Sequence, residues 1–138
     1  MTERATLILN NDVAELDRVL TLVADLCARH GIPPDTEYDL KLALDEVVAN
    51  VARHAYPAGE KHQFTLDVSI SDAEFVARVE DDGAAFDPTA HPAPNLDAPV
   101  EERAEGGLGI YLVRQIMTSV DYQRAAGKNI LTLRKKLN

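Results

Sequence analysis

The organisation of this chain follows from residues 45–56, which read DEVVANVARHAY. They lie in a longer run, from about Thr36 to Ala55, whose apolar residues recur at helical spacing and predict a long amphipathic helix. Glu46 and Asn50 are four positions apart, so they share one face of that helix and lie one turn from each other. A carboxylate and an amide oxygen placed together can hold a metal ion and accept a proton beside a phosphate. The alternative is that both residues lie at the solvated edge of an ordinary helix.

The composition is that of one globular domain with an acidic surface. The 138 residues are 46% hydrophobic and 27% charged, which is enough for a sizeable core. The net charge of −9 and the pI near 4.8 argue against nucleic acid or an anionic membrane as the main partner. An acidic surface would suit a basic protein partner, although charge also keeps a small domain in solution.

Cysteine content and hydropathy indicate the cellular compartment in which the protein functions. The single cysteine, Cys27, lies in an apolar stretch and is expected to be a small buried hydrophobe. One cysteine allows no disulfide within the chain, and no zinc-binding spacing is present. The first residues lack the pattern of a signal peptide, and no apolar run in the sequence reaches membrane-spanning length. The sequence therefore predicts a cytoplasmic protein with no membrane partner.

The first part of the chain reads as a strand followed by a helix. A short edge strand is expected from Ala5 to Leu9, and a first helix from about Val13 to His30. Asn11 or Asp12 can cap this helix, and Gly31 is expected to end it.

The middle of the chain leads from the central helix into a hairpin and a long loop. Asp35 is expected to cap the central helix, and Pro57-Ala58-Gly59 to end it. Alternating apolar and polar residues then predict an antiparallel pair of strands, Phe64–Ile70 and Phe75–Val79. The segment from Thr89 to Gly107 is rich in proline and charge. A loop of that length in a compact domain is usually a functional lid or is disordered.

The last part of the chain predicts a helix and two strands. The helix begins within residues 106–109 and runs to about Thr118, and the strands lie near Asp121–Arg124 and Ile130–Arg134. No second domain or internal repeat is visible in the sequence. Together the segments predict one α+β domain, a two-layer sandwich with about three helices packed on one face of a mixed, largely antiparallel sheet.

Two further segments have the composition of ligand-binding motifs. In Asp81-x-Gly83, at a strand end, the carboxylate can accept a hydrogen bond from an exocyclic amine, and the glycine lets a flat ring or backbone approach closely. In Gly106-Gly107-Leu108-Gly109, glycines at a helix start expose backbone N–H groups that favour a phosphate. Each segment alone is also typical of an ordinary Asp-Gly turn or a flexible loop end. The order and spacing of the three segments form the stronger signal.

Taken together, the three segments resemble the sequence boxes of the ATPase fold shared by histidine kinases, DNA gyrase and MutL. In detail they resemble the small anti-sigma-factor serine/threonine kinases of bacteria, over nearly the whole chain. The resemblance is carried by Glu46-x-x-x-Asn50 with His54-Ala55-Tyr56, by Asp81-x-Gly83 with Phe86-Asp87-Pro88, and by Gly106-Gly107-Leu108-Gly109-Ile110. It implies one Bergerat-type ATP-binding domain over residues 1–138, with a lid loop at about 89–107.

The resemblance also implies roles for individual residues. Asn50 would ligate the Mg²⁺ that bridges the ATP phosphates, and Glu46 would be the general base that activates the attacking hydroxyl. Asp81 would bind the adenine amino group, with Gly83 beside the ring. The phosphates would be wrapped by the helix-start segment, Gly106, Gly107, Leu108 and Gly109.

The implied activity is that of a protein serine/threonine kinase that phosphorylates an anti-sigma antagonist protein and sequesters a sigma factor. A homodimer is also implied, with the first strand and helix as interface elements. The alternative is a non-catalytic ATP-binding module that switches protein partners by affinity alone. Glu46 favours the kinase, because binding alone needs no base. A fragment of a sensor histidine kinase is disfavoured, because no dimerisation helix with a phosphoacceptor precedes the domain.

The sequence departs from the resembled pattern at two places. Ala85 stands where much of the superfamily has a second glycine, and its methyl group fits if the backbone keeps φ below zero. Gly127 is followed by Lys128-Asn129, where many relatives carry Gly-Thr with the Thr near the adenine. Asn129 or Thr132 could replace that hydroxyl, and the sequence does not decide between them.

Overall fold

The computed structural model describes residues 2–90 and 107–137. Within these ranges the helices and strands are, in chain order, β1 (Glu3–Asn10), η1 (Val13–Glu15), α1 (Leu16–His30), α2 (Pro34–His54), β2 (Gln63–Ile70), β3 (Glu74–Asp81), η2 (Pro88–Ala90), α3 (Gly107–Ile116), β4 (Ser119–Ala125) and β5 (Lys128–Lys136).

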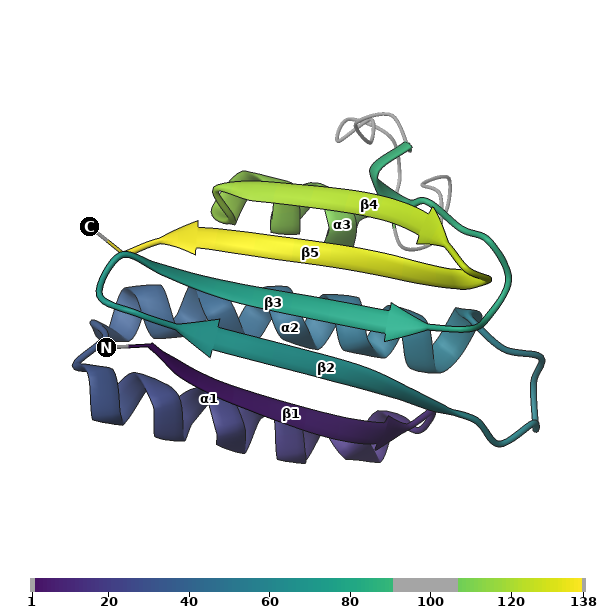
Figure 1. Cartoon of the computed structure of the whole chain (residues 1–138), viewed down its shortest axis with the longest axis horizontal. Helices are drawn as coiled ribbons and strands as arrows, with labels where there is room; N and C mark the ends of the chain where they lie inside the picture. Colours follow the sequence, from purple (N-terminus) through teal and green to yellow (C-terminus); the bar gives the residue numbers. More distant parts are fainter. Residues whose placement is uncertain (1, 91–106, 138) are drawn as a thin grey trace.

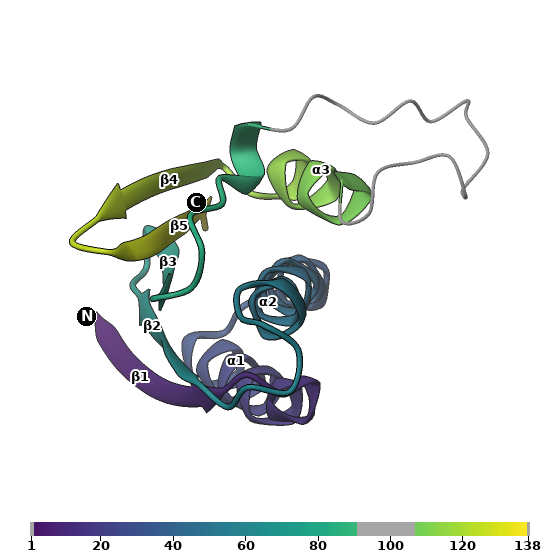
Figure 2. The same cartoon turned by 90° about the vertical axis from the view of Figure 1, so that its right-hand side faces the viewer.

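In the described part of the chain, five strands form a single sheet in the order β1-β2-β3-β5-β4 (Figure 1). All four pairings are antiparallel, so the sheet is antiparallel throughout rather than mixed. Viewed end-on, α1, α2 and α3 lie on one face of this sheet (Figure 2). The predicted two-layer α+β sandwich is confirmed, and the first strand is an edge strand as expected.

The core lies between the sheet and the helices because each element presents one apolar face. Alternate residues of β2 and β3 are buried, in agreement with the predicted hairpin; they are Phe64, Leu66, Val68, Ile70, Phe75, Ala77 and Val79. The matching face of α2 is also buried and consists of Leu40, Ala43, Leu44, Val47 and Val48. Cys27 in α1 is 1% exposed, which confirms its place in the core.

The first helix begins differently from the prediction. Its start is a separate 3-10 turn, η1, and the α-helix proper begins at Leu16. Asp12 provides the cap, since its Oδ1 accepts a hydrogen bond from the Ala14 N–H at 2.9 Å. Asn11 instead donates to the Glu60 carbonyl at 2.8 Å. Gly31 ends the helix with φ 64°, in the left-handed region that glycine adopts without strain.

The prediction that Asp35 caps the central helix is wrong. The capping position of α2 is Pro33, which makes no side-chain cap hydrogen bond, and the helix begins at Pro34. Proline suits this first position because its fixed φ is already helical and its missing N–H needs no partner there. Asp35 lies inside the first turn, where its charge complements the helix dipole.

Most of the predicted lid, at about residues 89–107, lies outside the described residues. Its described beginning is η2, where the Asp87 carboxylate accepts hydrogen bonds from the Thr89 N–H and hydroxyl at 2.8 and 2.6 Å. Arg114 in α3 donates to the Thr89 carbonyl at 3.2 Å, so this beginning is joined to α3. Among the described helices, none is both long and apolar enough to cross a membrane.

Candidate functional site

A cavity of about 210 Å³ lies where α2, α3 and the ends of β3 and β5 meet. Its volume is below the roughly 300–1,000 Å³ of a complete small-molecule site, so by itself it suits the ring part of a larger ligand. The lining is mainly apolar with a few polar groups, the usual composition of such a site. It comprises Val47, Asn50, Val51, His54, Ala55, Val79, Asp81, Ala84, Ala85, Phe86, Pro88, Ile110, Tyr122, Asn129 and Leu131.

Helix α2 brings two of the sequence-predicted residues to this region. Asn50 is half-buried and lines the cavity directly. Glu46, one turn earlier and also half-buried, is not part of the cavity lining. Its carboxylate lies instead against α3, where a Cβ added to Gly109 would be 2.1 Å from Glu46 Oε2. Glycine at position 109 therefore lets the first turn of α3 rest directly on the Glu46 carboxylate.

The segment after β3 is held against the C-terminal end of α2. A Cβ added to Gly83 would be 2.1 Å from the carbonyl oxygen of Ala55, so only glycine fits this contact without a shift. The next residue, Ala84, donates its N–H to the same carbonyl at 3.2 Å. These contacts fix the backbone of the residues that directly follow Asp81.

Asp81 is 6% exposed and is paired with Asn129, which is 7% exposed and lies opposite it in β5. Asn129 Nδ2 donates to Asp81 Oδ1 at 3.0 Å, and the Gly83 N–H donates to the same oxygen at 2.9 Å. Among the described residues these are the hydrogen bonds that Asp81 accepts through its side chain. Both of these hydrogen bonds go to Oδ1 and neither to Oδ2, and the Asp81 side chain lines the cavity.

All the hydrogen-bonding capacity of the Asn129 amide is used, which fixes its orientation. Besides Asp81, its Nδ2 donates to the Ala84 carbonyl at 2.8 Å. Its Oδ1 accepts from the Tyr122 hydroxyl at 2.5 Å and from the Phe86 N–H at 3.3 Å. A buried amide that donates two hydrogen bonds and accepts two is a rigid support for the carboxylate beside it.

The structure shows where the residues at the two departures from the resembled pattern lie. Asn129, not Thr132, lies beside Asp81; Thr132 is further along β5, opposite Arg78. Ala126 is the non-glycine residue with positive φ in the described ranges, so Ala85 does not have one. The methyl group of Ala85 therefore costs no backbone strain, and it lines the cavity.

The glycine-rich segment lies at the start of α3 in the part that is described. Gly107, Leu108 and Gly109 form the first turn of that helix, while Gly106 lies outside the described residues. A helix start of this kind offers unpaired N–H groups and a positive dipole end to an anion. Within the ranges 2–90 and 107–137, no cluster of three or more His, Cys, Asp or Glu could hold a metal ion.

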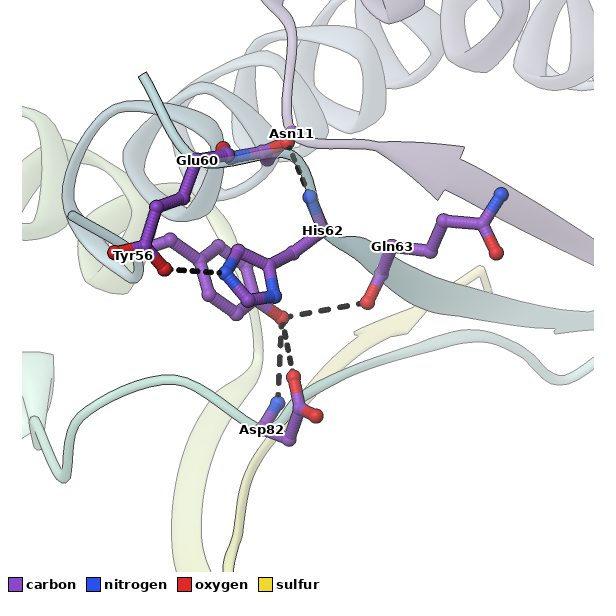
Figure 3. A network of polar contacts seen from close by, with 6 residues as sticks. All are labelled: Asn11, Tyr56, Glu60, His62, Gln63 and Asp82. Carbon is purple, nitrogen blue, oxygen red and sulfur yellow. Dashed lines mark hydrogen bonds and ion pairs between the residues drawn. The ribbon is translucent and has the colours of Figure 1, made fainter. Parts of the chain in front are cut away.

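Sequence reasoning missed a second polar network at the same end of the molecule (Figure 3). The Tyr56 hydroxyl donates to Asp82 Oδ1 at 2.8 Å, and the Tyr56 ring stacks on His62 at a centroid distance of 4.2 Å. Burial, and then the hydrogen bond to Asp82, raise the pKa of Tyr56 far above its ordinary value. The sequence contained the tyrosine in a motif but no sign of its partners, which lie in other strands and loops.

Comparison with known proteins places the chain among ATPases and protein kinases. Residues 9–135 match the family model described as histidine kinase-like ATPase domain. Serine/threonine-protein kinase BtrW of Bordetella bronchiseptica is 34% identical over 96 residues, which are 70% of this chain and 68% of that protein. Serine-protein kinase RsbW of Listeria innocua is 27% identical over 113 residues, which are 79% of this chain and 72% of that protein.

A solved structure shares the fold. It is the histidine kinase domain of a blue-light activated histidine kinase from Erythrobacter litoralis, with a TM-score of 0.55 and 22% sequence identity. The match covers 91% of this chain and 60% of the solved one. At this identity the likeness concerns the arrangement of helices and strands.

Proposed function

Because the chain belongs to the histidine kinase-like ATPase family, we propose that it is a protein serine/threonine kinase that uses ATP with Mg²⁺. The relatives BtrW and RsbW carry this enzyme class in their names and align over most of the chain. The cavity beside Asp81 suits the adenine ring, and the first turn of α3 suits the phosphates.

Recognition of the base rests on Asp81. Its Oδ1 is occupied by Gly83 and Asn129, so Oδ2 is the acceptor for the adenine amino group. The apolar side chains around it, such as Val79 and Leu131, provide the low-polarity walls in which that hydrogen bond is strong.

Phosphate binding rests on Asn50 and the start of α3. The Asn50 amide oxygen is a hard ligand of the kind Mg²⁺ takes, and Mg²⁺ is usually held by few protein groups together with substrate phosphates. The protein is acidic, so a bound ion would supply the positive charge that neutralises the phosphates of the nucleotide. The first turn of α3, which begins at Gly107, would offer its N–H groups to the phosphates.

The transfer step rests on Glu46. Its carboxylate accepts the proton of the attacking serine or threonine hydroxyl, while the hydroxyl oxygen forms a bond to the terminal phosphorus and the bond to ADP breaks. The observation that carries this assignment is the contact of Glu46 with the glycine position 109 of α3. This contact supports the proposal because the Glu46 carboxylate lies against the start of α3, to which the proposal assigns the phosphates.

The proposed protein partners follow from the anti-sigma kinases that the sequence resembles. The substrate would be an anti-sigma antagonist protein, and the second partner a sigma factor held in an inactive complex. A homodimer built on β1 and α1 is part of the same proposal. The net charge of −9 favours partners with a basic docking surface.

The test is a single-turnover measurement with radiolabelled ATP, Mg²⁺ and candidate antagonist proteins. Glu46→Gln should keep ATP binding and lower the transfer rate by about 10²–10⁴-fold, because shape is kept and the base is removed. Glu37→Gln is the matched control, since Glu37 lies on the same helix in a surface ion pair with Lys41 at 2.7 Å. Equal rates for parent and Glu46→Gln would remove Glu46 from catalysis. ATP binding without transfer by the parent would indicate a binding module instead.

A further inference from the structure

We propose that Tyr56 is a positioning residue of the nucleotide pocket, which holds Asp82 and thereby fixes the neighbouring Asp81 carboxylate. The inference rests on the proposed function, because it concerns how the adenine-binding residue is kept in place. Tyr56 itself is not part of the cavity lining, so it acts through other residues.

The Tyr56 hydroxyl makes a two-point contact with one residue. It donates to Asp82 Oδ1 at 2.8 Å and lies 3.4 Å from the Asp82 N–H, which donates back to it. The Gln63 carbonyl, at 3.3 Å, is a longer alternative acceptor for the same proton. A hydroxyl has one proton, and the shorter, charge-assisted hydrogen bond to the carboxylate is the stronger of the two. Figure 3 shows these contacts converging on the hydroxyl.

The ring of Tyr56 is held in place by the loop that follows α2. It stacks on the His62 ring with an angle of 10° between the planes. The His62 backbone N–H donates to Asn11 Oδ1 at 2.9 Å, and His62 Nε2 lies 3.0 Å from Glu60 Oε1 (Figure 3). Because the stacked His62 is itself held by Glu60 of the same loop and by Asn11 from the segment after β1, the hydroxyl is a fixed point rather than a freely rotating group.

The contact between Tyr56 and Asp82 affects the pocket through the backbone that connects Asp82 to its neighbours. Asp82 lies between two residues of the site. Asp81 before it is proposed to bind the adenine, and Gly83 after it packs with its backbone against Ala55. Ala55 and Tyr56 thus hold successive residues of this segment from the α2 side. Asn129 holds the Asp81 side chain from the β5 side. Loss of the Tyr56 hydroxyl releases one side of this support and lets the Asp81 carboxylate move relative to the base.

The hydroxyl remains a donor under all ordinary conditions. Burial and the carboxylate of Asp82 raise the pKa of Tyr56, so the proton stays on the oxygen at neutral pH. The positioning contact is therefore constant rather than switched by pH near neutrality.

The experiment compares Tyr56→Phe with Tyr38→Phe, the same chemical change at a side chain of α2 that is 66% exposed. Tyr56→Phe should weaken Mg²⁺-ATP binding about 3- to 10-fold, as expected for loss of one charge-assisted hydrogen bond acting indirectly. Its preference for ATP over GTP should fall, while the transfer rate at saturating ATP stays at the parent's value. Tyr38→Phe should leave all three quantities unchanged.

A double-mutant cycle separates positioning from simple stabilisation. Asp82→Ala should reproduce the loss in ATP affinity, and the double variant should be no worse than either single one, because both remove the same contact. A lowered unfolding temperature with unchanged ATP affinity and selectivity in Tyr56→Phe would overturn the proposal. Additive losses in the double variant would overturn it as well. A parent that binds no ATP would instead contradict the proposed function as a whole.

Discussion

At the scale of single residues, the carboxylate of Asp81 is held so that its two oxygens differ. Oδ1 accepts from both Gly83 and Asn129, and Oδ2 is the oxygen that we propose for the ligand. Proteins that select one base usually do so by matching a buried acceptor to an amino group and leaving a carbonyl unpaired. In the proposed function, the selectivity of this pocket for a base would therefore depend on the neighbours of Asp81 as much as on Asp81 itself.

The Asp81→Asn variant tests this arrangement. Because Gly83 and Asn129 both donate, the new amide should turn its oxygen toward them and its NH₂ group toward the ligand. ATP binding should weaken by roughly 1–3 kcal/mol, and the preference for ATP over GTP should shrink or reverse, since a donor now faces the base. Calorimetry with both nucleotides measures the effect. Asp67→Asn is the control. It changes a carboxylate in β2 that accepts a hydrogen bond from the Thr6 hydroxyl in the neighbouring strand β1. Unchanged ATP and GTP affinities would exclude Asp81 from the pocket.

Gly109 is a second residue whose contacts lead to a clear expectation. In Gly109→Ala the added Cβ would be 2.1 Å from Glu46 Oε2, so either the carboxylate or the start of α3 must move. A misplaced base should lower the transfer rate by about 10²-fold. Leu112→Ala changes a 39% exposed side chain on the same helix and should leave the rate nearly unchanged. A full transfer rate in a folded Gly109→Ala would show that Glu46 does not need its present position.

The candidate site residues that the sequence predicted are those whose spacing lies within one element. Glu46 and Asn50 stand out because a helical repeat places them together, and Asp81 and Gly83 because a strand ends in a turn. Asn129 was named only as one of two alternatives and Tyr122 was not selected, because their contacts depend on the register of β3, β5 and β4. A shift of the register by one residue would turn Asn129 to the other face of the sheet, and the sequence alone does not exclude it.

At the scale of elements, α2 serves both the core and the site. Its apolar face is buried against the sheet, while its half-buried edge carries Glu46 and Asn50. The predicted bounds of this helix and of the β2–β3 hairpin agree closely with the structure, because their hydrophobic patterns are long and regular. The errors fell at helix ends, where a 3-10 turn or a proline replaced the expected start, and local hydrogen bonds decide these positions.

The reactivity of the Cys27 thiol in α1 can be used to measure whether this helix is packed against the core. Burial, with a smaller contribution from the charge of Glu37, raises the pKa of the Cys27 thiol to about 11. The thiolate is the reactive form, so thiol reagents at pH 8 should label the native protein very slowly and the unfolded protein readily. A raised folded-state pKa also means that this group's contribution to stability is complete below pH 9.0 and is lost as the pH rises toward 11.

Labelling kinetics in increasing denaturant provide the measurement. The labelling rate should follow the fraction of molecules in which α1 has opened. Cys27→Ser should abolish the signal and identify the reacting group. Rapid labelling of the native protein at pH 8 would contradict the buried position.

At the scale of the whole molecule, the two-layer arrangement could be predicted but the strand order could not. Neighbouring hairpins are expected from short turns, as for β2–β3 and β4–β5. The pairing of β1 with β2, across two intervening helices, and of β3 with β5 joins segments that are distant in sequence. Such pairings depend on the packing of the complete core, so local patterns cannot define them.

The cavity is assembled from α2, β3, α3, β4 and β5, so no short fragment of the chain contains it. A ligand that binds there binds only the complete fold, and mass action then draws the population of molecules toward that fold. At a free ligand concentration about a thousand times the dissociation constant, the added free energy of unfolding is about 4 kcal/mol, which is large beside the marginal stability of a small domain. If the ligand is the nucleotide of the proposed function, the lifetime of this protein in the presence of that nucleotide would therefore depend on its ligand as well as on its sequence.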